Sequence, residues 1–234
     1  MKRFYKIASI HEEDKGYSVC LDGKSVKTKT KKPLQHKSCD IAELMMLEWA
    51  EQDDAIKPDT MPVTQIITTL IDHVDAHREQ ITHNILKYLD TDLLCYRVHE
   101  PAALAERQKE VWGKWTDWCE KEYKASIQIT EGLAALEQDK TLHQNLRTYV
   151  DGLDLDHFNI LQVVTSLSGS LILALAFVHK QADPEDILEC AYLEERYKEE
   201  LYDADFYGSD PMLEKQQASK RLDLEACWKI LSCL

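Results

Sequence analysis

The chain has 234 residues, of which 44% are apolar and 30% charged, which is typical of a globular protein. Its formal net charge of −14 repels phosphate groups and argues against nucleic acid or an anionic membrane as a partner. The seven cysteines include no CxxC pair, so the sequence predicts neither a disulfide framework nor a zinc knuckle.

The first part of the chain has the pattern of a small β-rich unit. Short alternating runs fill residues 3–34, and Asp22-Gly23 in LDGKSV can supply the positive φ angles of a tight hairpin turn. The next stretch, SCDIAELMMLEWAEQDD, has apolar residues at helical spacing. Two prolines in IKPDTMPVTQ then mark a linker. We therefore expect a β-rich domain with one helix over residues 1–60.

The rest of the chain, residues 61–234, is predicted to be an α-helical bundle, so the fold class is α+β. Glycine and proline are scarce, and helical periodicity continues through most of this region. One long helix or two abutting ones are expected in VTQIITTLIDHVDAHREQITHNILKYLDTDLLCYR. Single helices are expected in PAALAERQKEVWGKWTDWCEKEY, QDKTLHQNLRTYVDGL, LDHFNILQVVTSLSGSLILALAFVHK and DPEDILECAYLEERYKEELYDADFYG. In the last of these, Asp183 is expected as the cap and Pro184 as the first helical residue.

One run raises the question of a membrane span. Residues 160–178 contain no charge and are about long enough to cross a bilayer. The run also contains a glutamine, a threonine and several serines, and its flanks do not form an anchor pattern. A helix that is apolar all round also lies at the centre of helical bundles. The sequence therefore favours a buried central helix and no membrane insertion.

The stretch YLDTDLLCYR contains two carboxylates and a cysteine, which could indicate a catalytic site. If the helix continues through it, Asp90 faces solvent and Asp92 lies on the apolar side, so the two do not share a reaction centre. A buried Asp92 needs a partner, which could be an arginine, a tryptophan N–H or free backbone N–H groups at a helix break. Cys95 has only Arg97 nearby to activate it. A structural role for Asp92 is the favoured interpretation.

A metal site is the second catalytic possibility. His73 and His77 stand four residues apart beside Asp72, a spacing that can hold a metal. Val74 stands where the HExxH motif has its glutamate, and a solvated polar face with incidental histidines is the favoured interpretation. We expect no bound metal and no cofactor. A small metal-dependent enzyme using these three residues, or a thiol enzyme using Cys95, remains the alternative.

The tryptophans of VWGKWTDWCEKEY follow a helical spacing. Trp112, Trp115 and Trp118 stand three apart, which is typical of a core or an interface anchor. The sequence has no phosphate-binding loop, no nucleophile elbow and no catalytic triad order. The residues by themselves therefore favour a binding protein with no catalytic residues.

Several separated stretches together resemble one family: RFYK, YSVCLDGKSVKT, LMMLEWAEQDDAIKPDTMPVTQIITTLID, YLDTDLLCYR, WGKWTDW and SGSLILALA. They are similar to the assembly chaperones that act on the alpha subunit of the F-type ATP synthase, in mitochondria and alpha-proteobacteria. The resemblance runs from Arg3 to about Tyr207. It implies a β-rich N-terminal domain and an orthogonal α-helical bundle. It also implies that the protein binds the unassembled alpha subunit and shields its subunit-contact surface, without hydrolysing ATP.

The resemblance also implies a binding site near the end of the chain, in ECAYLEERYKEEL. Glu194 and Glu195 match the acidic pair of the family, and we assign them with Tyr192 to partner binding, Glu195 foremost. Glu195 shares a helical face with apolar residues, including Tyr192 and Tyr202. A structural salt bridge from Glu195 to Arg196, Lys198 or a distant base is the alternative.

The sequence departs from the family at three places: Lys29, Gly113-Lys114 and Lys198 stand where proline, Asp-Pro and glutamine are usual. The first residues resemble neither a secretory signal nor a transit peptide. We therefore expect a bacterial cytoplasmic protein, with the mitochondrial matrix after processing as the alternative. We also expect a monomer when no partner is bound.

Overall fold

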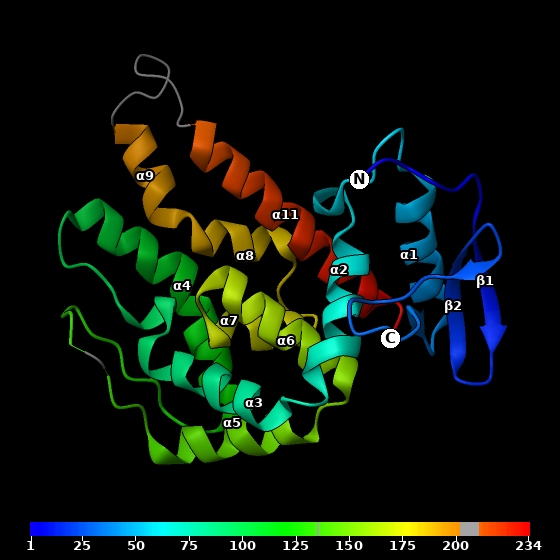
Figure 1. The fold of residues 1–234 in the computed structure, drawn as a ribbon. Helices are drawn as coiled ribbons and strands as arrows, with labels where there is room; N and C mark the ends of the chain where they lie inside the picture. The colour runs from blue at the N-terminus through cyan, green and yellow to red at the C-terminus, as the bar shows by residue number, and fades with distance from the viewer. Residues whose placement is uncertain (135, 202–210) are drawn as a thin grey trace. The chain divides into compact units, whose positions relative to one another are not determined.

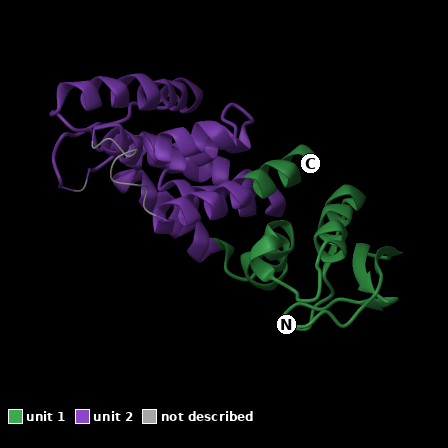
Figure 2. Ribbon diagram, turned by 90° about the horizontal axis from the view of Figure 1, so that it is seen from above, with its two compact units in different colours: residues 1–78, 225–234 green, residues 79–224 purple. Residues whose placement is uncertain are grey.

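The computed structural model describes residues 1–134, 136–201 and 211–234. These residues divide into two compact units (Figure 2), Met1–Arg78 with Glu225–Leu234, and Glu79–Leu224. The first contains a small antiparallel sheet and the second is helical, which confirms the predicted α+β class. Helix α11 (Pro211–Ser232), which the sequence analysis did not place, begins in the second unit and ends in the first.

The first unit is built around strand β2, which pairs with each of the other strands in an antiparallel four-stranded sheet (Figure 1). Helix α1 packs against β1 and β2, and α2 packs against α1. The elements are β1 (Ala8–Glu13), β2 (Gly16–Leu21), β3 (Lys24–Ser25), β4 (Gln35–His36), α1 (Cys39–Ala50), a 3-10 turn (Pro58–Thr60), α2 (Pro62–Thr69) and a π-helical turn (Leu70–Val74).

The hairpin predicted from LDGKSV is present between β2 and β3. Asp22 and Gly23 have φ angles of 48° and 77°, and Leu21 pairs with Lys24 across the turn. The carboxylate of Asp22 also accepts the backbone N–H of Lys6 at 3.1 Å. Positive φ angles at both central residues match the twist of the two strands, so a local sequence signal determines this turn.

The stretch EWAEQ holds the start of α2 in place. Glu48 in α1 accepts the backbone N–H groups of Val63 and Thr64, both at 2.7 Å, and so caps a helix distant in sequence. This contact explains why the first unit extends to Arg78, whereas the sequence analysis put the domain boundary at residue 60. The domain boundary at residue 60 stays a prediction.

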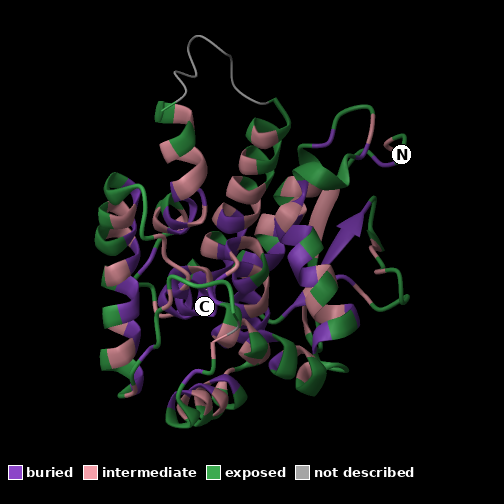
Figure 3. Ribbon diagram, turned by 90° about the vertical axis from the view of Figure 1, so that its left-hand side faces the viewer, coloured by how far each residue is buried: buried purple, intermediate pink, exposed green. Residues whose placement is uncertain are grey.

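The second unit is a bundle of helices. Its elements are α3 (Arg78–Lys87), two 3-10 turns (Tyr88–Thr91 and Leu93–Cys95), α4 (Ala102–Tyr123), α5 (Lys140–Gly152), α6 (Leu155–Ser168), α7 (Leu171–Val178), α8 (Pro184–Ala191) and α9 (Leu193–Leu201). Helix α7 lies at the centre, against α4, α6 and α8. All eight of its residues are buried, as expected for a helix that is apolar all round. In Figure 3 the buried stretches, in purple, lie mostly in the interior, whereas the outer helix faces are exposed.

Two predicted single helices are each broken into two. Gly169, with φ of 72°, ends α6, and the side chain of Ser170 caps α7 by accepting the N–H of Leu173 at 3.1 Å. Tyr192 likewise separates α8 from α9. The break at Gly169 lets the short apolar helix α7 turn back and bury itself, which periodicity alone cannot show.

Helix α8 begins where the sequence predicted. Asp183 and Asp186 form a reciprocal capping box, with Pro184 at the first turn, as the sequence indicated.

In the described parts of the chain, no helix is long and apolar enough to cross a bilayer. The uncharged run at residues 160–178 is split between α6 and α7.

Candidate partner-binding site

Asp92 is fully buried, and its partners are backbone N–H groups at two helix starts. Its Oδ1 accepts the N–H of Leu94 at 3.1 Å, and its Oδ2 accepts the N–H of Ile172 at the start of α7 at 3.0 Å. The chain is extended at Asp92 (φ −63°, ψ 130°), so the helix does not continue through it. Asp92 therefore joins the YLDTDLLCYR stretch to the central helix.

Burial raises the pKa of Asp92 to about 6 because the ionised carboxylate loses its water. The hydroxyl of Ser170 and the surrounding backbone N–H groups act in the opposite direction by stabilising the charged form. Asp92 is thus ionised near neutral pH, where its two oxygens satisfy two helix starts.

This pKa predicts a specific pH dependence of stability. A pKa raised above its unfolded value means that the folded state binds the proton more tightly, so stability from this group is fully present below about pH 4. It is lost as pH rises through about 6, by up to about 3 kcal/mol. Urea unfolding from pH 4 to 7 should show this decline in the wild type, relative to Asp92→Asn. A constant difference between the two proteins would contradict the prediction.

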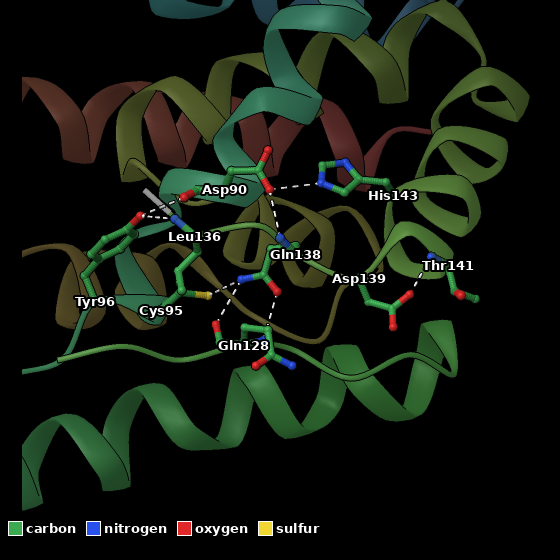
Figure 4. Close-up of polar contacts among 9 residues, drawn as sticks. All are labelled: Asp90, Cys95, Tyr96, Gln128, Leu136, Gln138, Asp139, Thr141 and His143. Carbon is green, nitrogen blue, oxygen red and sulfur yellow. Dashed lines mark hydrogen bonds and ion pairs between the residues drawn. The ribbon is translucent and has the colours of Figure 1, made fainter. Parts of the chain in front are cut away.

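The sequence predicts that Asp90 faces solvent, but in the structure its side chain has partners within the protein. Its half-buried carboxylate accepts hydrogen bonds from His143 Nε2 at 3.0 Å and from the backbone N–H of Gln138 at 3.2 Å (Figure 4). Its backbone carbonyl accepts the Tyr96 hydroxyl at 2.8 Å. The first carboxylate of the stretch thus anchors the start of α5 and the irregular segment before it.

The side chain of Gln138 completes this network around Cys95 (Figure 4). Gln138 bonds the backbone of Gln128 twice, at 2.8 and 2.9 Å, and its Nε2 lies 3.6 Å from Cys95 Sγ. Cys95 is fully buried, and burial followed by the charge of Asp92 raises its thiol pKa. A protonated, inaccessible thiol is unsuited to nucleophilic attack, so the contacts around Cys95 favour a structural interpretation of YLDTDLLCYR.

The residues of the alternative metal site have other contacts. Asp72 accepts the hydroxyl of Thr28 at 2.7 Å as well as that of Thr30, and the ring Nδ1 of His77 bonds the carbonyl oxygen of His73 at 2.9 Å. Within residues 1–134, 136–201 and 211–234, no group of three or more potential ligands is placed to hold a metal ion.

Trp112 and Trp118 of α4 lie in different surroundings. Trp112 is buried and donates from Nε1 to the carbonyl oxygen of Cys190 at 3.1 Å, which joins α4 to α8. Trp118 is half-buried and makes edge contacts with Tyr123 and His179, at centroid distances of 6.3 and 5.4 Å. Both make the packing contacts expected of structural residues.

The three residues assigned to partner binding lie together where α9 begins. Tyr192 is 5% exposed, and Lys220 Nζ lies 5.1 Å from its ring centroid. Its buried hydroxyl has no hydrogen-bond partner among the described residues. Burial raises its pKa, and the nearby charge of Glu195 adds to the effect. Tyr202, expected on the same face, lies outside the described residues.

The two glutamates of the acidic pair differ in their contacts. Glu194 Oε1 accepts a hydrogen bond from Gln108 Nε2 at 2.8 Å, and Gln108 is fully buried in α4. Glu195 is half-buried and forms no ion pair or hydrogen bond in the described part of the chain, so the predicted bridges to Arg196 and Lys198 are not seen there. Both glutamates are half-buried, but only Glu194 is bound by another side chain of the described chain.

Gln108 and Lys220 are the residues of this site that the sequence analysis missed. Gln108 stands four residues after Leu104 and four before Trp112 on the buried stripe of α4, a polar interruption that could have indicated it. Lys220 belongs to α11, and only the tertiary structure brings it to Tyr192.

An open depression near this pair is lined by four carboxylates and one arginine. It has a volume of about 290 Å³ and is lined by Asp183, Glu185, Asp186, Glu189 and Arg196. Asp186 forms an ion pair with Lys114 at 2.9 Å, and Glu185 pairs with Arg221. Glu189 is exposed and has no ion pair among the described residues.

Known proteins resemble this chain in both sequence and structure. Residues 2–120 match the profile of the family described as ATP12 chaperone protein. The crystal structure of Atp12 from Paracoccus denitrificans is 29% identical, with a TM-score of 0.87, covering 99% of this chain and 97% of that one. A protein from Agrobacterium tumefaciens is 30% identical, with a TM-score of 0.89, covering 99% of this chain and 85% of that one.

A β-rich unit joined to a helical bundle, with this family match, defines a chaperone and not an enzyme. The chain belongs to the ATP12 chaperone family, whose members assist assembly of the F1 ATP synthase. The family indicated by the sequence resemblance is thereby confirmed, and the metal-dependent or thiol enzyme is set aside.

Proposed function

We propose that the protein binds the unassembled alpha subunit of the ATP synthase and shields its subunit-contact surface, without hydrolysing ATP. Membership of the ATP12 family supports a role in ATP synthase assembly. The main observation in support of this binding site is that the half-buried carboxylate of Glu195 has no ion pair among the described residues.

The cost of partly burying a charged carboxylate explains why Glu195 is suited to binding a cationic group of a partner. Partial burial removes water from the charged group, and inside this protein no cation replaces that water within the described residues. A lysine or arginine from the alpha subunit would supply the missing charge, with the exposed Glu189 adding to the local negative potential. Cytoplasmic or matrix location and a monomeric free state stay predictions.

The proposal predicts that the protein suppresses aggregation of isolated alpha subunit without any nucleotide. Alpha subunit diluted from denaturant should scatter less light when an equimolar amount of this chaperone is present, because a covered apolar surface cannot associate with other copies. Serum albumin at the same concentration is the control. No reduction in scattering, or a reduction that needs ATP, would refute the proposal.

A further inference from the structure

An open groove in the helical unit lies where the chain leaves the YLDTDLLCYR stretch. It has a volume of about 690 Å³ and is lined by Arg97, Val98 and His99, by Ala102, Ala105, Glu106 and Lys109 of α4, and by Ile129, Thr130 and Glu131. Apolar side chains from all three segments line its surface, and Ile129 is 44% exposed.

One wall of the groove has a free backbone edge. Thr130 pairs with the YLDTDLLCYR stretch in parallel, donating to the carbonyl oxygen of Cys95 and accepting the N–H of Arg97, both at 2.8 Å. The backbone N–H and C=O groups of Ile129 form no hydrogen bond to any described residue, and the chain bends after Thr130, at Glu131. Alternate residues of an extended chain direct these groups to opposite edges, so this edge can bond a further extended segment.

Arg97 is the charged residue of the groove that lacks an ion pair. The rim charges pair with each other: His99 lies 3.6 Å from Glu131, and Lys109 lies 3.9 Å from Glu106. The guanidinium of Arg97 is half-buried and bonds only a backbone carbonyl and the Thr116 hydroxyl, which leaves Nη1 without a partner among the described residues.

The electrostatics of Arg97 agree with this geometry. Burial lowers its pKa, and the opposing influences of Cys95 and Asp117 do not reverse that effect. Asp117 is exposed and forms no ion pair with the guanidinium within the described chain. A desolvated cation without a carboxylate is costly, in a protein whose net charge is strongly negative.

We propose that this groove binds an extended segment of a client protein that places a glutamate or aspartate, flanked by apolar residues, on Arg97. The backbone of that segment pairs with the free edge at Ile129, and its carboxylate completes the hydrogen bonds of the guanidinium. The identity of the client rests on the proposed function, whereas the preference of the groove for an extended acidic segment does not depend on that function.

A buried amide connects the groove to the acidic site. Gln108 Oε1 accepts the backbone N–H of Val98, a groove residue, at 2.8 Å, and its Nε2 donates to Glu194 at the same distance. Because one fully buried side chain holds both, the groove and Glu194 are fixed relative to each other. A single client can therefore engage both surfaces.

The test uses synthetic peptides of alternating valine and threonine with one central glutamate, and a matched peptide with glutamine there. Fluorescence anisotropy should show the glutamate peptide binding about tenfold more tightly, because a charge-assisted hydrogen bond is lost in the other. Arg97→Gln should abolish this preference, whereas Lys121→Gln, at an exposed position of α4 outside the groove lining, should keep it. N-methylation of the peptide backbone should weaken binding to the wild type.

Equal affinity of the two peptides for the wild type would overturn the proposal, and this measurement needs no variant to fold. A preference for glutamate that survives Arg97→Gln, or unaffected binding of the N-methylated peptide, would also overturn it. None of these measurements contains alpha subunit, so a failure of the proposed function is seen separately, in the scattering assay.

Discussion

Replacing Asp92 with alanine is expected to lower the free energy of unfolding by about 3–5 kcal/mol. The change leaves the N–H groups of Leu94 and Ile172 unpaired in a site with no access to water. It also removes a fully buried side chain and leaves a cavity. Urea denaturation near neutral pH measures the effect, as a lower midpoint with an unchanged slope.

Asp90→Ala is the matched control, two residues away in the same stretch. Asp90 is half-buried and bonds His143 and the backbone of Gln138, so its loss should cost only about 1 kcal/mol. An Asp92 variant with an unchanged midpoint and lost capture of alpha subunit would instead place Asp92 in a functional site.

Glu195→Lys is expected to abolish capture of the alpha subunit while the melting temperature stays near that of the wild type. Glu195 has no ion pair among the described residues, so the fold loses little when its charge is reversed. At an interface the new lysine would face the partner's cation. Repulsion between the two like charges should raise the dissociation constant by roughly tenfold or more. Pull-down of labelled alpha subunit and a melting curve are measured in parallel.

Glu43→Lys controls for the change in net charge. Glu43 is exposed on α1, in the other unit, and its reversal changes the total charge by the same amount. Capture should survive in this variant. If Glu195→Lys melts at a much lower temperature, or still captures the subunit, Glu195 belongs to the fold and not to the interface.

Local signals in the sequence determined several parts of this structure. Asp22-Gly23 can adopt positive φ angles at low cost, so the hairpin follows from two residues. Asp183 and Pro184 begin α8 for an equally local reason, a cap and a preset φ angle. The uncharged run at residues 160–178, which forms part of α6 and all of α7, could be assigned to the interior because a helix that is apolar on every side is typically buried.

The family resemblance, carried by separated motifs, indicated the chaperone class that the comparisons confirm. It also pointed to Glu194 and Glu195 as a pair. It could not distinguish them, because the distinguishing contact comes from Gln108 in a helix 86 residues away in sequence.

Only the tertiary structure decided where the helices break and which carboxylates are paired. Helical periodicity continues through Gly169 and Asp92, yet both interrupt a helix so that short apolar segments can turn back on one another. The extended backbone at Asp92 is stable because α7, about eighty residues later, supplies an N–H group to its carboxylate. Sequence patterns report which face of a segment is apolar, but the partner of a buried polar group comes from whichever distant segment packs against it.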